Sequence, residues 1–197
     1  HSKLNDGQIK IINEILDSKF ADLNYILQDE QSIKFNFITN SFYKLISLIE
    51  NKYCRITRIN KDKKIKRINL TKDDFDNLLI NKDLSSRIKK LDLLIFFEKS
   101  YFMNSKIITL PKYGTWFINY GVNNNIFVGF WESFLKLGTS KVIIQKINKS
   151  KVPSKINIID KGIYSTRTIS WFLNRDFIFE KSSILIVKNL KLLNIKY

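Results

Sequence analysis

The fold is decided by two apolar stretches of the sequence, LDLLIFF at residues 91–97 and TWFIN at residues 115–119. Both are nearly continuous runs of apolar side chains, without a regular alternation of apolar and polar ones. Strands that are covered on both faces have this pattern, which is typical of parallel sheets in α/β proteins. We therefore expect two buried strands of such a sheet.

Outward from these strands, expected helices alternate with expected strands. Helices are expected at residues 9–20, 42–49, 71–90 (two helices), 130–137 and 168–193, the last with an interruption at residues 174–176, and strands at residues 23–27, 53–59, 65–70, 142–147 and 156–163. The alternation predicts an α/β fold with a mostly parallel open sheet flanked by helices. With two prolines, six glycines and no internal repeat, little divides the chain, so we expect residues 1–197 to form a single domain.

The composition indicates a globular protein, since 44% of the residues are hydrophobic and 13% are aromatic. No apolar run is long enough to span a membrane, and the beginning of the chain lacks the apolar core of a signal peptide. Cys54 is the sole cysteine, which excludes an intrachain disulfide and a cysteine cluster for zinc. This pattern fits a reducing compartment, so the expected location is cytoplasmic.

The formal charge is +16 and the isoelectric point is near 9.8. A nucleic-acid partner is one interpretation of so basic a chain. The other is codon bias, because lysine, isoleucine and asparagine are abundant together, as in translations of AT-rich genomes. A binding face needs cations that gather, and the tightest clusters are residues 61–67 and the lysines at positions 146, 149, 151 and 155. Both interpretations stay open.

The chain has one histidine, His1, at its beginning. We therefore expect no imidazole to act as a general base, as the activator of a nucleophile or as an interior metal ligand. Neither the Gly-x-Gly-x-x-Gly pattern nor the Walker pattern of phosphate-binding loops occurs. No metal site is expected, and acid–base chemistry would have to rest on carboxylates.

Three positions carry polar groups in a notable setting. Asp160 lies inside an expected apolar strand, either as a functional acid or as the partner of Lys161 in a surface pair. Glu132 lies in the first turn of an expected helix, where a negative charge complements the helix dipole; an acid–base role is the alternative. The asparagines at residues 123–125 follow a core strand, where they form a turn or contact a ligand.

Five short segments follow one another in the second half of the chain. They are LDLLI at residues 91–95, KYGTWFINYG at residues 112–121, VGFWE at residues 128–132, SKVIIQ at residues 140–145, and Asn174-Arg175 with KSS at residues 181–183. In this order and spacing they resemble the formyltransferase superfamily, which includes methionyl-tRNA formyltransferase and relatives that use 10-formyltetrahydrofolate. The resemblance implies a Rossmann-like, three-layer fold, here with its first strand missing, because the chain opens on an expected helix.

In that family an Asn or Ser, a His two residues later and an Asp from a later loop form the catalytic set. By the resemblance, Phe117 stands at the first position and Asn119 at that of the histidine, and Asp160 is the acid nearest to the third. An amide cannot exchange protons near neutral pH as an imidazole does, although it can donate to an oxyanion. The resemblance therefore implies catalytic roles for Asn119 and Asp160 only if activity persists.

The resulting hypothesis is a formyltransferase-like protein of one-carbon metabolism that is catalytically weak or inactive, a pseudoenzyme that keeps a ligand pocket. Its relatives transfer a formyl group to an amine, so 10-formyltetrahydrofolate is the implied cofactor and a folate, nucleotide or sugar nucleotide the implied ligand. The residues expected to line the pocket are Phe117, Tyr120, Asn123, Asn124, Asn125 and Trp131. Two alternatives stay open: a basic nucleic-acid-binding domain without enzymatic activity, and a scaffold that binds a protein partner.

Overall fold

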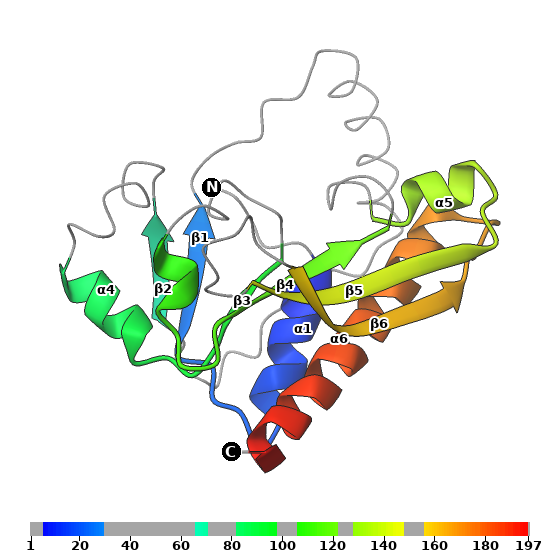
Figure 1. Ribbon diagram of the computed structural model, residues 1–197. Helices are drawn as coiled ribbons and strands as arrows, with labels where there is room; N and C mark the ends of the chain where they lie inside the picture. Colours follow the sequence, from blue (N-terminus) through cyan, green and yellow to red (C-terminus); the bar gives the residue numbers. More distant parts are fainter. Residues whose placement is uncertain are drawn as a thin grey trace.

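The computed structural model describes residues 6–29, 66–70, 82–97, 106–121, 128–147 and 156–196 (Figure 1). The helix expected at residues 42–49 and the strand expected at residues 53–59 lie outside these ranges, as do the asparagines at residues 123–125.

The elements within these ranges alternate between helix and strand for most of their order. They are α1 (Asp6–Asp17), β1 (Tyr25–Asp29), β2 (Lys66–Leu70), α4 (Lys82–Lys89), β3 (Leu94–Phe96), the 3-10 helix η2 (Lys106–Thr109), β4 (Thr115–Tyr120), α5 (Phe130–Phe134), β5 (Thr139–Ile147), β6 (Ile156–Ser165) and α6 (Trp171–Lys196). The strand expected at residues 91–97 is reduced to β3. The carbonyls of Leu91 and Asp92 instead accept hydrogen bonds from the turn that precedes β4.

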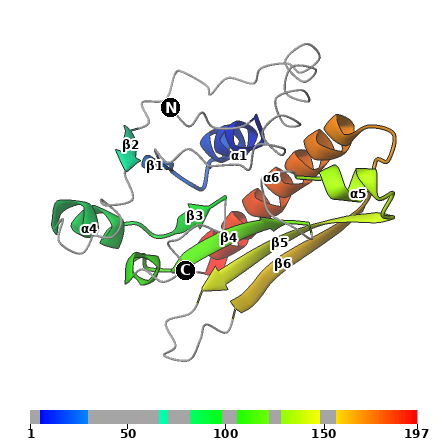
Figure 2. The ribbon, with the colours of Figure 1, turned by 90° about the horizontal axis from the view of Figure 1, so that it is seen from above.

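The strands form two sheets (Figures 1 and 2). In the smaller sheet β1 and β2 pair in parallel, from Tyr25 opposite Lys66 to Asp29 opposite Leu70. In the larger sheet the order is β3-β4-β5-β6. β3 and β4 are parallel, whereas β4 with β5 and β5 with β6 are antiparallel. β4 therefore has one parallel and one antiparallel neighbour.

The prediction of a mostly parallel, Rossmann-like sheet is wrong, because the larger sheet is mixed. The apolar run in β4 has another cause. Residues of α1 and α6 pack on one face of the strand, while Phe96 and Ile108 pack against Phe117 on the other. Burial on both faces gives a continuous apolar run whatever the direction of the neighbouring strands. The run therefore reports burial and not strand direction.

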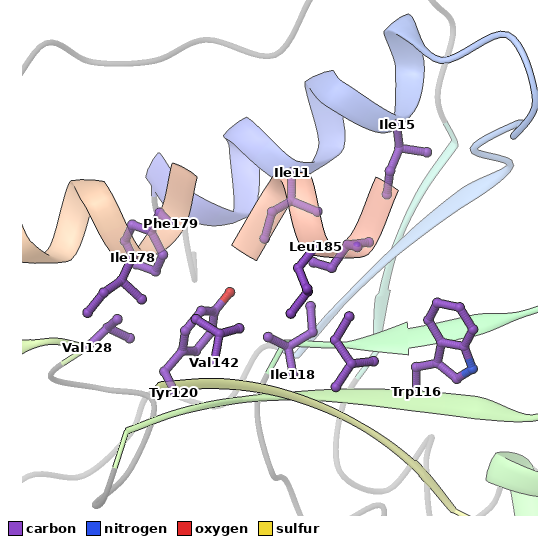
Figure 3. Packing of buried hydrophobic residues seen from close by; sticks show 12 residues of the cluster. Ile11, Ile15, Trp116, Ile118, Tyr120, Val128, Val142, Ile178, Phe179 and Leu185 are labelled. Carbon is purple, nitrogen blue, oxygen red and sulfur yellow. The ribbon is translucent and has the colours of Figure 1, made fainter. Parts of the chain in front are cut away.

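The main hydrophobic core lies between the four-stranded sheet and the two helices α1 and α6 (Figures 2 and 3). Its buried members are Ile11, Ile15, Trp116, Ile118, Tyr120, Val128, Val142, Ile144, Ile178, Phe179, Leu185 and Ile186. Along β4 the side chains of Trp116, Ile118 and Tyr120 point toward the helices, as the two-residue repeat of a strand requires (Figure 3). Burying one such isoleucine contributes roughly 1.5–3 kcal/mol to the free energy of folding.

α6 is one uninterrupted helix of 26 residues, so the interruption expected at residues 174–176 is absent. Asn174 does not disturb the helix because its side chain bonds to groups outside α6 and leaves the helix's own backbone alone. α1 approaches α6 closely at Gly7, where an added Cβ would overlap the ring of Phe179. None of the helices in the described ranges is both long and apolar enough to cross a membrane.

Candidate functional site

Asn119, the residue at the histidine position of the resemblance, lies near the end of β4 and is half-buried. It stands opposite Ile143 of β5, which stands opposite Lys161 of β6. These three residues lie on the face of the larger sheet that points away from α1 and α6, which we call the outer face. Phe117 shares this face. It is 4% exposed, and its ring stacks on that of Phe96 with centroids 5.2 Å apart.

Asp160 lies on the opposite face. It stands next to Ile144 in the register of β5 and β6, and its carboxylate reaches α6. There it accepts hydrogen bonds from Asn189 Nδ2 at 2.8 Å and Lys188 Nζ at 3.0 Å. The hydrogen bond from Asn189, followed by those from Lys188 and the Lys161 backbone, lowers the pKa of Asp160. The structure therefore does not bring Asn119 and Asp160 together, and Asp160 fastens β6 to α6.

Tyr120, expected in the ligand pocket, lies in the core instead. It is 5% exposed, its ring meets that of Phe179 edge-on at 5.6 Å, and its hydroxyl hydrogen-bonds to Ser182 Oγ at 3.4 Å. Burial raises the pKa of Tyr120. Trp131 is 39% exposed and packs edge-on against Phe130 at 5.1 Å. Of these two aromatic residues, Trp131 alone offers substantial surface to a ligand.

The side chain of Asn174 is the hub of a buried polar junction. It is fully buried, and its Nδ2 donates to the carbonyl of Gly129 at 3.0 Å and to Ser140 Oγ at 3.2 Å. Its Oδ1 accepts from the backbone N–H of Arg167 at 3.0 Å. Beside it, Trp171 Nε1 donates to the carbonyl of Val128 at 2.9 Å. One amide thus joins the start of α5, the start of β5, the turn after β6 and α6.

Gly129 can reach Asn174 because it lacks a side chain. Its φ of 74° lies in the left-handed region that favours glycine. A Cβ added there would stand 2.9 Å from both Asn174 Nδ2 and Ile178 Cδ1. Sequence reasoning did not assign this role to Asn174. The available signal was its position four residues before Ile178, on the buried stripe of α6, where a polar side chain needs partners.

Gly121 and Glu132 meet just beyond β4. Gly121 has a φ of 67°, and its N–H donates to the carbonyl of Lys141 at 2.9 Å. The carboxylate of Glu132 lies against its Cα, so an added Cβ would collide with Oε1. Glu132 is 4% exposed, and no described residue donates a hydrogen bond to its carboxylate or forms an ion pair with it. The dipole role expected for Glu132 does not explain this burial, because α5 is only five residues long.

Four of the five segments that carry the resemblance therefore meet at one place, the carboxyl end of β4, whereas the segment at residues 91–95 lies beside the start of that strand. Gly121 ends one segment and contacts Glu132 of the next, and Gly121 also bonds to Lys141 of the third. Asn174 then ties Gly129 to Ser140. Although these residues lie between positions 121 and 174 of the sequence, they form one connected unit.

In the described ranges, no group of three or more His, Cys, Asp or Glu side chains is arranged to hold an ion. Several cations of the α6 region serve the fold itself. Arg167 lies over the ring of Phe177 at 4.5 Å and Lys181 over the same ring at 5.3 Å, while Lys188 pairs with Asp160. Most of both basic clusters lies outside the described residues, so the nucleic-acid interpretation stays a prediction.

The chain was also compared with known proteins. No protein-family model matches it, and no curated protein matches it either.

Proposed function

We propose that this protein is a formyltransferase-like domain that binds a small molecule and does not transfer a formyl group. The observation that carries the proposal is the convergence at the end of β4 of four of the five segments that resemble the family. Gly121, Gly129 and Asn174 each have a geometry that other residues would not reproduce. A constellation of this kind supports a retained site.

The ligand would bind at the carboxyl ends of β3 and β4, the parallel strands of the larger sheet. Ligands of α/β sheets bind outside the carboxyl ends of parallel strands, where loops meet. Asn119 offers a donor and an acceptor on the outer face, and the half-buried ring of Phe96, which stacks on the buried Phe117, offers an apolar surface beside it. Trp131, which is exposed, supplies a ring on the α5 side. A folate or a nucleotide carries the flat ring system that such surfaces accommodate.

The absence of transfer follows from the two side chains that would perform it. An amine that attacks a formyl carbon must lose a proton, and the amide of Asn119 cannot take one near neutral pH. Asp160 lies across the sheet and is engaged by Asn189 and Lys188. Loss of an acid–base partner lowers rates by about two to four orders of magnitude.

Calorimetric titration tests the binding part of the proposal. Folates, among them 10-formyltetrahydrofolate, and a panel of sugar nucleotides are titrated into the wild type and two glycine variants. We expect at least one ligand to bind the wild type, to bind Gly121→Ala more weakly, and to bind Gly138→Ala unchanged, since nothing lies within 4 Å of a Cβ added at Gly138. Failure of every ligand to bind the wild type would refute the retained site.

A radiolabelled formyl assay with amine acceptors tests the catalytic part. We expect no turnover above the reaction without protein, and robust turnover would contradict the proposal.

Fluorescence anisotropy with labelled RNA and DNA tests the alternative function, nucleic-acid binding. Counterion release makes the affinity for nucleic acid fall steeply as the salt concentration rises. A steep salt slope with tight binding at moderate salt would favour the nucleic-acid alternative.

A further inference from the structure

We infer that the carboxylate of Glu132 recognises a protonated primary amine on the ligand of this protein. The inference rests on the proposed function for the presence of a ligand at the end of β4, and it adds a recognition residue and a chemical class of ligand. Its starting point is a carboxylate that is almost fully enclosed, next to the strand end, without a partner among the described residues.

The polar groups that the structure describes at the end of β4 and the start of α5 have other partners. The N–H of Gly121 donates to Lys141 O at 2.9 Å, and Ser133 Oγ donates to Arg167 O at 3.2 Å. The amide of Asn174 serves Gly129, Ser140 and Arg167. None of these groups donates to the carboxylate, so within the part of the chain that the structure describes no hydrogen-bond donor or cation compensates its charge.

Such an arrangement is unfavourable for a purely structural residue. Moving a carboxylate out of water without a partner is strongly destabilising, and a neutral side chain of the same shape would fit this position better. Because Gly121 has no Cβ, Oε1 of Glu132 lies directly against the backbone at the end of β4. A cation that arrives with a ligand would remove this penalty.

The cation is an ammonium and not a metal ion. Calcium takes six to eight oxygen ligands and magnesium demands an octahedral set, whereas the described residues gather no cluster of three or more acidic or otherwise ligating side chains. A primary ammonium is compact and has three N–H donors, so it can form a charge-assisted hydrogen bond with a single carboxylate.

Stability measurements on Glu132→Gln test the first half of the inference without any ligand. Because the variant removes an uncompensated charge, we expect its Tm to equal or exceed that of the wild type by up to a few degrees. Glu132→Leu, which is apolar, should behave in the same way. Glu180→Gln is the matched control, since Glu180 is half-exposed and pairs loosely with Lys10 at 3.9 Å. If both Glu132 variants unfold at a clearly lower Tm than Glu180→Gln, or fail to fold, the carboxylate is structural and the inference is overturned.

Thermal shift with ethylammonium chloride tests the second half. We expect a saturable rise in the Tm of the wild type in the millimolar range, relative to sodium chloride at equal ionic strength. The rise should vanish in Glu132→Gln, persist in Glu180→Gln, and be absent with tetramethylammonium, which has no N–H donor. No rise in the wild type, or an equal rise with both cations, would overturn the inference. A positive ethylammonium result beside failed folate and sugar-nucleotide titrations would count against the proposed function alone.

Discussion

The two faces of the four-stranded sheet differ in what covers them. On the helix side, Ile118, Val142 and Ile144 are at most 2% exposed beneath α1 and α6. On the outer face, Phe117 is covered by Phe96 and Ile108, but the β6 residues Ile158 and Ile163 are 59% and 54% exposed. The sheet is thus covered on both faces at β4 and on the helix side alone at Ile158 and Ile163 of β6. This difference explains why β4 has an unbroken apolar run.

The largest expected effect tests this contrast directly. Ile118→Ala, on the helix side, should lower the free energy of unfolding by about 3–4 kcal/mol, because it removes buried methyl groups and leaves a cavity. Ile163→Ala is the matched change on the outer face and should cost about 0.5 kcal/mol or less. Urea denaturation measures both. Equal losses would mean that the outer face of β6 is as well covered as the helix side.

The junction at the edge of the covered face comes next. Asn174→Ala should destabilise the protein by about 2–3 kcal/mol, because it leaves the Gly129 carbonyl and the Arg167 N–H without their partner in a buried place. Asn194→Ala, at an exposed position of the same helix, should change the stability by less than about 0.5 kcal/mol. Chemical denaturation of both variants measures these changes. If Asn174→Ala lowers the free energy of unfolding by less than about 1 kcal/mol, the junction does not contribute to stability as its hydrogen bonds indicate.

A smaller effect is expected at the end of β4. Gly121→Ala should cost about 1–2 kcal/mol, because its φ of 67° disfavours any side chain and the new Cβ would meet Glu132. Gly138→Ala meets open space and should be neutral or slightly stabilising. Thermal unfolding compares them. Tolerance of alanine at both positions would show that the strand end is less tightly fixed than its contacts indicate.

The smallest effect concerns the charge on the helix side. The pKa of Asp160 is lowered in the folded protein, mainly by the hydrogen bond from Asn189. Its contribution to stability is therefore fully present above about pH 4, the range of an unfolded aspartate, and is lost as the pH falls through the folded pKa. Asp160→Asn should cost less than about 1 kcal/mol at pH 7.

The pH dependence of that cost is the measurement. Denaturation of Asp160→Asn and wild type at neutral and acidic pH should show a difference that shrinks as the pH falls. Asp17→Asn, at an exposed position on α1, controls for the general change in net charge. A difference that stays constant with pH would mean that the hydrogen bond to Asn189, and not the charge, carries the contribution.

Much of the secondary structure was predictable because it depends on local patterns. The helix around residues 9–20, the strands at residues 115–119, 142–147 and 156–163, and the long last helix all follow from the spacing of apolar residues. The direction of pairing was not predictable from the same signal. Whether β5 runs with or against β4 depends on how the chain returns to the sheet, which an apolar run does not encode.

The site was harder still. Asn119 and Asp160 were expected to act together because of their positions in the resemblance. Asn119 stands opposite Ile143 and Asp160 opposite Ile144, and since successive residues of a strand point to opposite faces, the two side chains lie on opposite faces of the sheet. The last helix was expected to be interrupted at residues 174–176. Asparagine is a weak helix former, but the tertiary hydrogen bonds of Asn174 outweigh this preference. That no described residue pairs with the Glu132 carboxylate depends on the hydrogen bonds that distant residues make with one another, so no local sequence pattern predicts it.

The bulge between Ile144 and Gln145, where β6 gains a residue, has a further consequence. β6 is the last strand of the described sheet, ten residues long, with bare isoleucines on one side. An edge of this kind invites other chains to add strands and grow into aggregates. The extra residue kinks the edge, and Lys161 next to it places a charge among the isoleucines. Removing the bulge and the charge of Lys161 together would therefore leave β6 as a straight, apolar edge strand to which further chains could add strands.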